Sequence, residues 1–316
     1  MILRFLPGFA LLVLPLFLSA AEVLDFVPPA ARMVFRIDLA ENLPGLNDVR
    51  EDLLTTVSRQ SGFDEKNNKS SNISKLLQEI TVVTPNLTED YSFVVVKTKV
   101  TEQVFCSELE KMTGVQPKSV KTGKTSEYRM AFANFGVGSV LAPKQRTFAF
   151  AFVADKIAVF SKDSLERFRS FQKLGLDPKD RKLLLVPKTI AAGFVKMDPE
   201  FLLENPLLPP FDLAVTSLAA GPAGSLVVNM SFTAADKPAA KQLQKYLQQM
   251  VMVGAMLLNQ TDEDLMQEWM TSVKVKREEN TVLVKGVFTR FFIDRLAGMA
   301  DRQMREPEPP KTEKKQ

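Results

Sequence analysis

Two aspartates are the first residues whose type and spacing suggest chemistry. Asp38 ends a predicted strand that closes with Phe35-Arg36-Ile37-Asp38, and Asp198 ends an equivalent strand that closes with Val195-Lys196-Met197-Asp198. Hydrolysis by two carboxylates needs no histidine, so Asp38 and Asp198 are candidate catalytic residues. The alternative, which we favour, is that each aspartate caps the helical segment that follows it, because Asp is a preferred N-cap residue.

Most other catalytic sites are excluded by composition. The chain of 316 residues has no histidine and one cysteine, Cys106, which we interpret as a small buried residue on a helix. Without imidazole, Ser-His-Asp and Cys-His catalysis and ordinary zinc sites cannot form. Ser170 and Lys173 have the spacing of a serine-lysine pair, but Arg167 lies beside them on an exposed helix, where the lysine stays protonated. We therefore expect no enzymatic activity, no metal and no cofactor.

Nucleotide and nucleic-acid binding are also disfavoured. Gly123-Lys124-Thr125 resembles the end of a phosphate-binding loop, but Lys118 stands where that loop needs a glycine. Gly136-Val137-Gly138 lacks the third glycine of a dinucleotide-binding turn. The net charge of +4, from 41 basic and 37 acidic residues, is small for a nucleic-acid-binding protein.

One region, 113–146, is locally basic. It carries six basic residues against Glu127: Lys118, Lys121, Lys124, Arg129, Lys144 and Arg146. We interpret it as an inserted loop, either solvated or in contact with an anionic partner such as lipid headgroups, polysaccharide or an acidic protein. Lys118, Lys121, Lys124 and Arg129 are its candidate ligand-binding residues.

The segment 250–258 is apolar on every face of the helix predicted for it. Its methionines, Met250, Met252 and Met256, suit irregular apolar surfaces. An all-round apolar helix is normally buried on several sides, so we favour core packing. The alternative is that the three methionines line a groove for an apolar ligand.

The two ends of the chain do not belong to the predicted fold. Arg4, the apolar run 5–18 and Ser19-Ala20-Ala21 form the pattern of a secretory signal peptide, 1–21, cleaved near Ala21. The alternative is an uncleaved anchor. The run is too short to span a bilayer, and we expect no transmembrane helix in the mature chain. The end, 305–316, is rich in proline and charge and predicts a disordered tail.

The remaining chain shows a weak internal duplication. Val27-Pro28 and Val186-Pro187 each precede a strand that ends in an apolar-basic-apolar-Asp sequence. Both halves read β-α-β-β-α-β-β-α, which predicts an α+β fold of two similar units, each a mainly antiparallel sheet with helices on one face. The units are 22–173, including the insertion 113–146, and 190–304, joined by a linker 174–189.

Helices and strands follow from periodicity and turn residues. In the first half we predict helices at 47–59, 73–80, 102–112 and 163–173, and strands at 81–84, 92–100, 147–153 and 157–160. In the second half we predict strands at 212–219, 225–233, 273–276 and 282–288, and helices after Pro199, at 236–258, from Asp264 and at 290–304.

The exported N-terminus, the Val-Pro motif and the two α+β units resemble exported bacterial proteins of unassigned function built from duplicated α+β units. The resemblance implies a fold and a compartment, and it brings no catalytic residue. We therefore predict a non-enzymatic scaffold or binding protein of the bacterial envelope, periplasmic or on the cell surface. Its partner would be an envelope protein or an anionic surface. The alternatives are a carrier for an apolar or anionic ligand, and a hydrolase with paired carboxylates.

Overall fold

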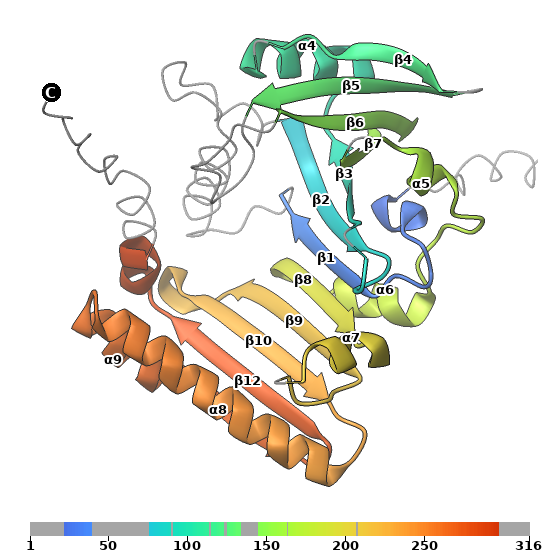
Figure 1. The fold of residues 1–316 in the computed structure, drawn as a ribbon. Helices are drawn as coiled ribbons and strands as arrows, with labels where there is room; N and C mark the ends of the chain where they lie inside the picture. The colour runs from blue at the N-terminus through green and yellow to red at the C-terminus, as the bar shows by residue number, and fades with distance from the viewer. Residues whose placement is uncertain are drawn as a thin grey trace, which may run out of the picture.

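The computed structural model describes residues 22–39, 76–89, 91–113, 115–122, 125–133, 145–162, 164–206 and 208–296. Twelve strands lie in these ranges: β1 Met33–Asp38, β2 Leu77–Thr84, β3 Phe93–Thr98, β4 Lys118–Thr122, β5 Thr125–Ala133, β6 Gln145–Ala154, β7 Ile157–Lys162, β8 Thr189–Lys196, β9 Leu213–Ala220, β10 Leu226–Thr233, β11 Lys274–Glu278 and β12 Thr281–Phe288. They form one sheet in the order β11-β12-β10-β9-β8-β1-β2-β3-β7-β6-β5-β4, with antiparallel neighbours (Figure 1). The predicted α+β class with antiparallel strands is confirmed.

Helices connect and cover these strands. They are η2 Val23–Phe26, α4 Glu102–Thr113, α5 Glu166–Arg169, α6 Pro178–Leu184, α7 Pro199–Glu204, η4 Pro222–Gly224, α8 Lys237–Asn259 and α9 Glu263–Ser272, and residues 290–296 are also helical. The long helix α8 begins as its sequence predicts. The carboxylate of Asp236 accepts a hydrogen bond from the Ala239 N–H at 2.8 Å, and Pro238 lies in the first turn.

The two halves share one sheet instead of forming two separate sheets. The first strand of each half pairs with the other, with Met33 opposite Val195 and Phe35 opposite Gly193. Both β1 and β8 carry apolar residues on both faces, so neither is suited to an exposed sheet edge. Outward from this joint, β1-β2-β3-β7-β6 and β8-β9-β10-β12-β11 follow the same order. Shared order alone does not establish a duplication, which therefore stays a prediction.

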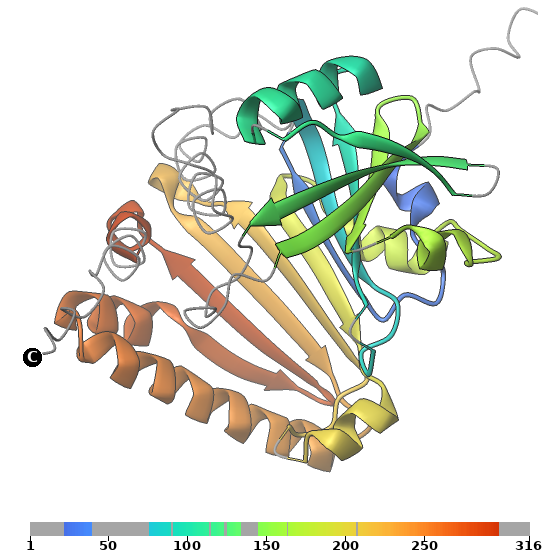
Figure 2. The ribbon, with the colours of Figure 1, turned by 45° about the horizontal axis from the view of Figure 1, so that its top comes forward.

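Helices cover both faces of the sheet, not one. Phe232 packs with α8, and Val94 packs with α4, so these two helices share one face, called here the α8 face. The registers that link Val94, Val82 and Phe35 across adjacent strands place all three on that face. Figure 2 shows α4 at one end of the sheet and α8 along the other.

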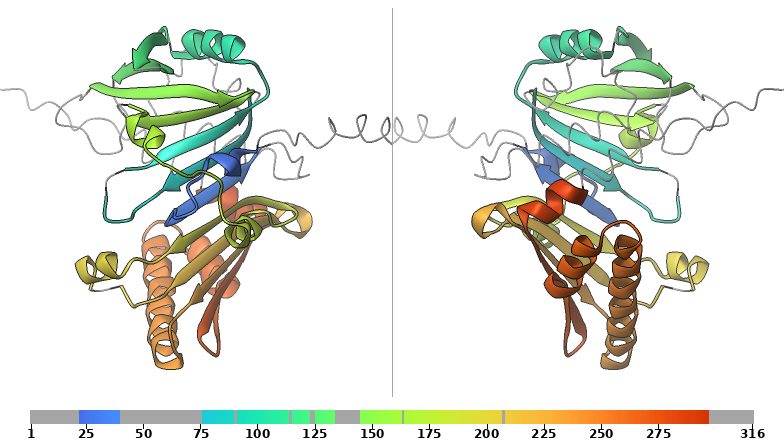
Figure 3. Two further views of the ribbon diagram at one scale, coloured as in Figure 1. Left: turned by 90° about the vertical axis from the view of Figure 1, so that its right-hand side faces the viewer. Right: turned by 90° about the vertical axis from the view of Figure 1, so that its left-hand side faces the viewer.

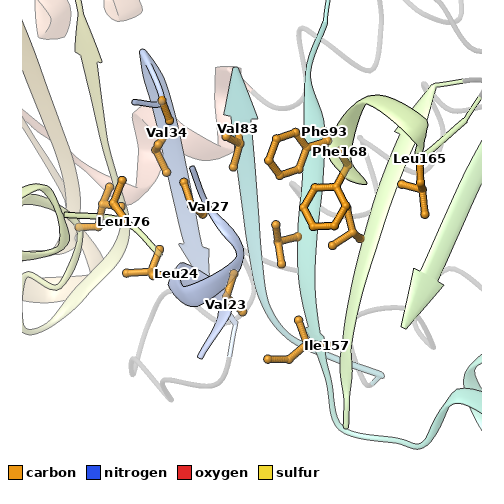
Figure 4. Packing of buried hydrophobic residues seen from close by; sticks show 14 of the residues in the cluster. Val23, Leu24, Val27, Val34, Val83, Phe93, Ile157, Leu165, Phe168 and Leu176 are labelled. Carbon is orange, nitrogen blue, oxygen red and sulfur yellow. The ribbon is translucent and has the colours of Figure 1, made fainter. Parts of the chain in front are cut away.

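The opposite face, called here the α6 face, holds the largest cluster of buried residues (Figure 4). There Val34 packs beside Leu24 of η2, and the ring of Phe93 meets that of Phe168 edge to face at 5.3 Å. Leu176 and Leu184 belong to the same cluster. The predicted linker 174–189 thus contains α6 and contributes Leu176 and Leu184 to the core.

Three predicted elements differ from the structure. Leu77–Ile80, predicted as helical, begin β2, because pairing with β1 and β3 satisfies this backbone on both sides. Within 163–173, α5 spans only Glu166–Arg169. The described residues of the predicted inserted loop 113–146 include β4, β5 and the start of β6. The predicted helix at 47–59 and the tail at 305–316 lie outside the described residues.

Candidate functional site: an apolar groove between α4 and α8

Two adjacent rows of residues on the α8 face line a groove across the central strands. The strand registers align the first row, which is Val82, Phe35, Gly193, Thr216 and Met230. They align the second row as Met33, Val195, Ala214 and Phe232. The groove has a volume of ≈ 310 Å³, at the lower end of the roughly 300–1,000 Å³ typical of small-molecule sites.

The lining of this groove is almost entirely apolar. Among the described residues that line it, Thr216 alone has a polar side chain. A charged ligand would lose its hydration there without gaining a partner, whereas a neutral apolar ligand would be stabilised by burial. Met230 is partly exposed, and its flexible thioether can adapt to the shape of a bound molecule.

Gly193 gives the groove its depth. A β-carbon at this position would come within 2.5 Å of the ring of Phe35 and 3.0 Å of the Val34 carbonyl oxygen. The missing side chain therefore lets the Phe35 ring lie over β8. Any larger residue would push that ring into the groove.

A second apolar cavity continues the same face under α4. Its volume is ≈ 390 Å³, and its lining includes Phe105 and Leu109 of α4 and Val94 of β3. Val94 lies opposite Val82, which lines the first groove, so the two cavities adjoin across one strand pair. Together they make the middle of the α8 face an extended apolar site between the two helices.

The candidate carboxylates do not meet. Because β1 and β8 are antiparallel and Met33 lies opposite Val195, Asp38 and Asp198 stand at opposite ends of the strand pair. At ~3.4 Å per residue, the eight positions that separate them along the strands amount to roughly 27 Å, far beyond the ~5–9.5 Å between the carboxylates of glycosidases. Asp198 caps α7 by accepting the Glu200 N–H at 3.0 Å, as the capping interpretation expects. Asp38 pairs with Arg36 at 2.9 Å, and Arg36 also binds Glu79.

The candidate basic residues are divided between two roles. Lys118 and Lys121 are exposed on β4, the edge strand of the sheet, where lysines also prevent edge-to-edge pairing. Arg129 is held in an ion pair with Glu127 at 2.8 Å. Lys124 lies outside the described residues. An anionic partner at β4 thus stays a prediction, without Arg129 as an available ligand.

The methionine-rich segment is not core. Met250, Met252 and Met256 are all exposed on α8, and only Ala255 of 250–258 is fully buried. Gly254 lies against the indole of Trp269, whose Nε1 donates to the Val251 carbonyl at 2.8 Å. The core interpretation is wrong because the sheet and α9 together cover only one side of α8. The exposed methionines cover the opposite side and do not line the groove.

Glu127 is the one fully buried acidic side chain of the described residues. Its two oxygens accept from Arg129 at 2.9 Å and from Arg169 at 2.7 Å. Burial by itself would raise the pKa of Glu127, but the hydrogen bonds from both guanidinium groups lower it below its ordinary value. The triad joins β5 to α5, which indicates a structural role.

Cys106 sits half-buried on α4 in a setting that suppresses reactivity. Burial, followed by the negative charge of Glu102, raises the pKa of the Cys106 thiol to about 11. The Tyr128 hydroxyl donates to Glu102 at 2.7 Å, and this hydrogen bond is the main reason that the pKa of Tyr128 rises to about 12. A thiolate nucleophile is therefore disfavoured here.

Comparisons with known proteins reveal a shared fold without a family. No family model matches the chain. No curated protein matches it either. The crystal structure of TP0453 in crystal form III is similar with a TM-score of 0.51 and 12% identity, over 90% of this chain and 99% of that chain. Crystal form IV gives a TM-score of 0.48 and 11% identity, over 89% and 97% of the two chains. The likeness to form III concerns the fold alone.

Sequence reasoning missed the groove residues entirely. Phe35, Gly193 and Thr216 come from three strands, and no local motif links them. The available signal was a glycine inside an apolar strand, which often marks close approach of another group.

In the described part of the chain, no helix is long and apolar enough to cross a membrane.

Proposed function

We propose that the protein is a non-enzymatic, exported binding protein that holds a neutral apolar ligand in the groove of its α8 face. The observation that carries this proposal is the groove itself, an apolar trough of ≈ 310 Å³ built from residues of five strands. A site lined this way can bind a hydrocarbon chain by burial of its surface, and it offers no group for acid-base or nucleophilic chemistry.

Export rests on the pattern of 1–21, in which Arg4 precedes an apolar run and small residues end at Ala21. We infer a periplasmic or cell-surface location from this pattern. An envelope compartment would place the groove near lipids and other apolar molecules, which agrees with the chemistry of its lining. Binding of an anionic surface through Lys118 and Lys121 is compatible with this function and stays a separate prediction.

The test uses the full chain, purified after it has been exported by the cell. Native mass spectrometry should detect a retained apolar molecule, and a fluorescent long-chain fatty acid and its uncharged methyl ester should both bind. Thr216→Phe fills the groove and should abolish binding of both probes. Thr216→Val keeps the side-chain volume and serves as the matched control, which should bind as well as the wild type.

Absence of a retained ligand, together with no binding of either probe, would overturn the proposal. Binding that survives Thr216→Phe would also overturn it, because the ligand would then lie elsewhere. A stronger preference for the charged acid than for the methyl ester would contradict a site that lacks charged lining residues.

A further inference from the structure

The outward side of α8 is a continuous apolar stripe. Its exposed members lie at adjacent positions or about one helical turn apart. They are Met250, Met252, Val253, Met256 and Leu257. Met256 and Leu257 keep 64% and 61% of their surfaces exposed, unusually high values for apolar residues of this size. The strands that α8 covers lie on one side of the helix (Figure 3). Ala240 and Leu243 are buried on that side, and the helical period places the stripe on the opposite side.

Opposite charges flank the two ends of this stripe. Lys241 and Lys245 are exposed on the N-terminal half of α8, on the same helical line as Met252 and Met256. At the other end, the corner between α8 and α9 carries Asp262 and Asp264, which both pair with Arg295, and the exposed Glu263 between them. The stripe is therefore apolar in the middle, basic at one end and acidic at the other.

This arrangement is complementary to itself. At ~1.5 Å per residue, Lys241 and Lys245 lie about 18 and 12 Å from Val253 along the helix. In the other direction α8 ends at Asn259, about 9 Å beyond Val253, and the chain turns there into α9, which begins at Glu263. A second copy laid antiparallel, with the twofold axis near Val253, thus brings Lys245 of each copy close to the corner of the other copy that carries Glu263.

We propose that α8 pairs with α8 of a second copy of this chain in an antiparallel, twofold-symmetric dimer centred near Val253. The acidic corner favours this partner over an anionic membrane surface, which would attract the lysines but repel Glu263 and its neighbours. The five exposed residues of the stripe are fewer than the roughly 20–30 residues per partner of stable complexes, so the dimer forms in a concentration-dependent way at micromolar protein. This inference is independent of the ligand proposed for the groove.

The first experiment maps the twofold axis by disulfide formation. In a Cys106→Ser background, Val253→Cys places two thiols at the axis and should form a covalent dimer under mild oxidation. Val104→Cys on α4 is the matched control, because Val104 and Val253 are both valines with 45% of their surface exposed on a helix. The control should stay monomeric, and equal cross-linking of both variants would overturn the proposal.

The second experiment tests the charge pairing without thiols. Sedimentation should give a dissociation constant that rises at least about tenfold in Lys245→Glu, and that returns toward the wild-type value in the Lys245→Glu, Glu263→Lys double variant. A wild-type chain that stays monomeric to about 100 µM overturns the proposal. Monomeric binding to vesicles of anionic phospholipid through Met256 and Leu257, lost in Met256→Gln, would assign this surface to a membrane instead.

Discussion

Gly193 lies directly opposite Phe35 in the β1–β8 pair, and a β-carbon on Gly193 would come within 2.5 Å of the Phe35 ring. This contact couples the joint between the two halves of the chain to the depth of the apolar groove. A single methyl group added at Gly193 is therefore enough to disturb both the joint and the groove.

Gly193→Ala should destabilise the protein by about 1–3 kcal/mol, because the added carbon forces the Phe35 ring out of its rotamer. Urea unfolding measures this change. In a Phe35→Leu background the ring is absent, so the same substitution should cost well under ~1 kcal/mol. Equal costs in the two backgrounds would show that the ring is not the clashing group.

Glu127→Gln should lower the free energy of unfolding at neutral pH by about 1–3 kcal/mol, because two guanidinium groups lose their buried carboxylate. The pKa of Glu127 is lowered in the folded state, so its stabilisation is complete above the ordinary value of 4.5 and is lost as the pH falls below it. The wild type should therefore lose stability more steeply than Glu127→Gln between about pH 5 and 3. Glu204→Gln, at an exposed site on α7, is the control and should keep the wild-type slope.

Cys106 should react slowly with thiol reagents. With a pKa of about 11 its thiolate population at pH 8 is about a hundredfold below that of a thiol with the ordinary value of 9.0. Alkylation by iodoacetamide, followed by mass spectrometry, measures the rate. Glu102→Gln removes one of the two causes and should speed alkylation several-fold, while burial keeps the rate below that of a free thiol.

Asp198→Ala should cost about 0.5–2 kcal/mol, the usual loss for an N-cap, and should leave any bound ligand in place. The carboxylate accepts the Glu200 N–H at the start of α7 and does not line the groove. Thermal unfolding and probe binding on the same sample separate these effects. A loss of probe binding without loss of stability would make Asp198 a candidate ligand-binding residue.

The exported protein should begin at Glu22. Its backbone nitrogen already donates to the Asp25 carboxylate at 2.8 Å, and Val23 and Leu24 are buried in the core directly after it. Cleavage after Ala21 would turn that nitrogen into a charged amine beside Asp25, a favourable pair. Intact mass measurement of protein from the periplasm decides the question, and a mass that includes 1–21 would favour the uncleaved anchor.

Local patterns predicted local structure well. The helix predicted at 236–258 forms as α8, capped by Asp236 with Pro238 in its first turn. The alternating residues of the predicted strand 147–153 lie on opposite faces of β6, with Phe150 and Ala149 in different clusters. The predicted strands 212–219 and 225–233 are joined by the turn 221–224, with positive φ at Ala223 and Gly224. In each case the interactions that determine the structure lie within a few residues of the sequence pattern that predicted it.

The joint and the groove could not be predicted because their contacts are distant in sequence. Leu76, Leu77 and Ile80 have helical spacing, yet pairing of β2 with β1 and β3 prevails over that periodicity. The run 250–258 predicted burial, because sequence alone does not show how many sides of a helix the fold will cover. The Asp38 and Asp198 motif repeats faithfully, but the antiparallel joint separates the two carboxylates.

The β1–β8 joint also has a consequence for folding. β1 is among the first segments to be synthesised, yet its partner β8 lies about 160 positions later, so the central pair contributes strongly to contact order and slows folding. Until β8 has been synthesised, one edge of β1 is unpaired and the central strand pair of the sheet is missing. The export proposed above requires a chain that stays unfolded while it crosses a membrane, and slow pairing of β1 with β8 would leave time for that step.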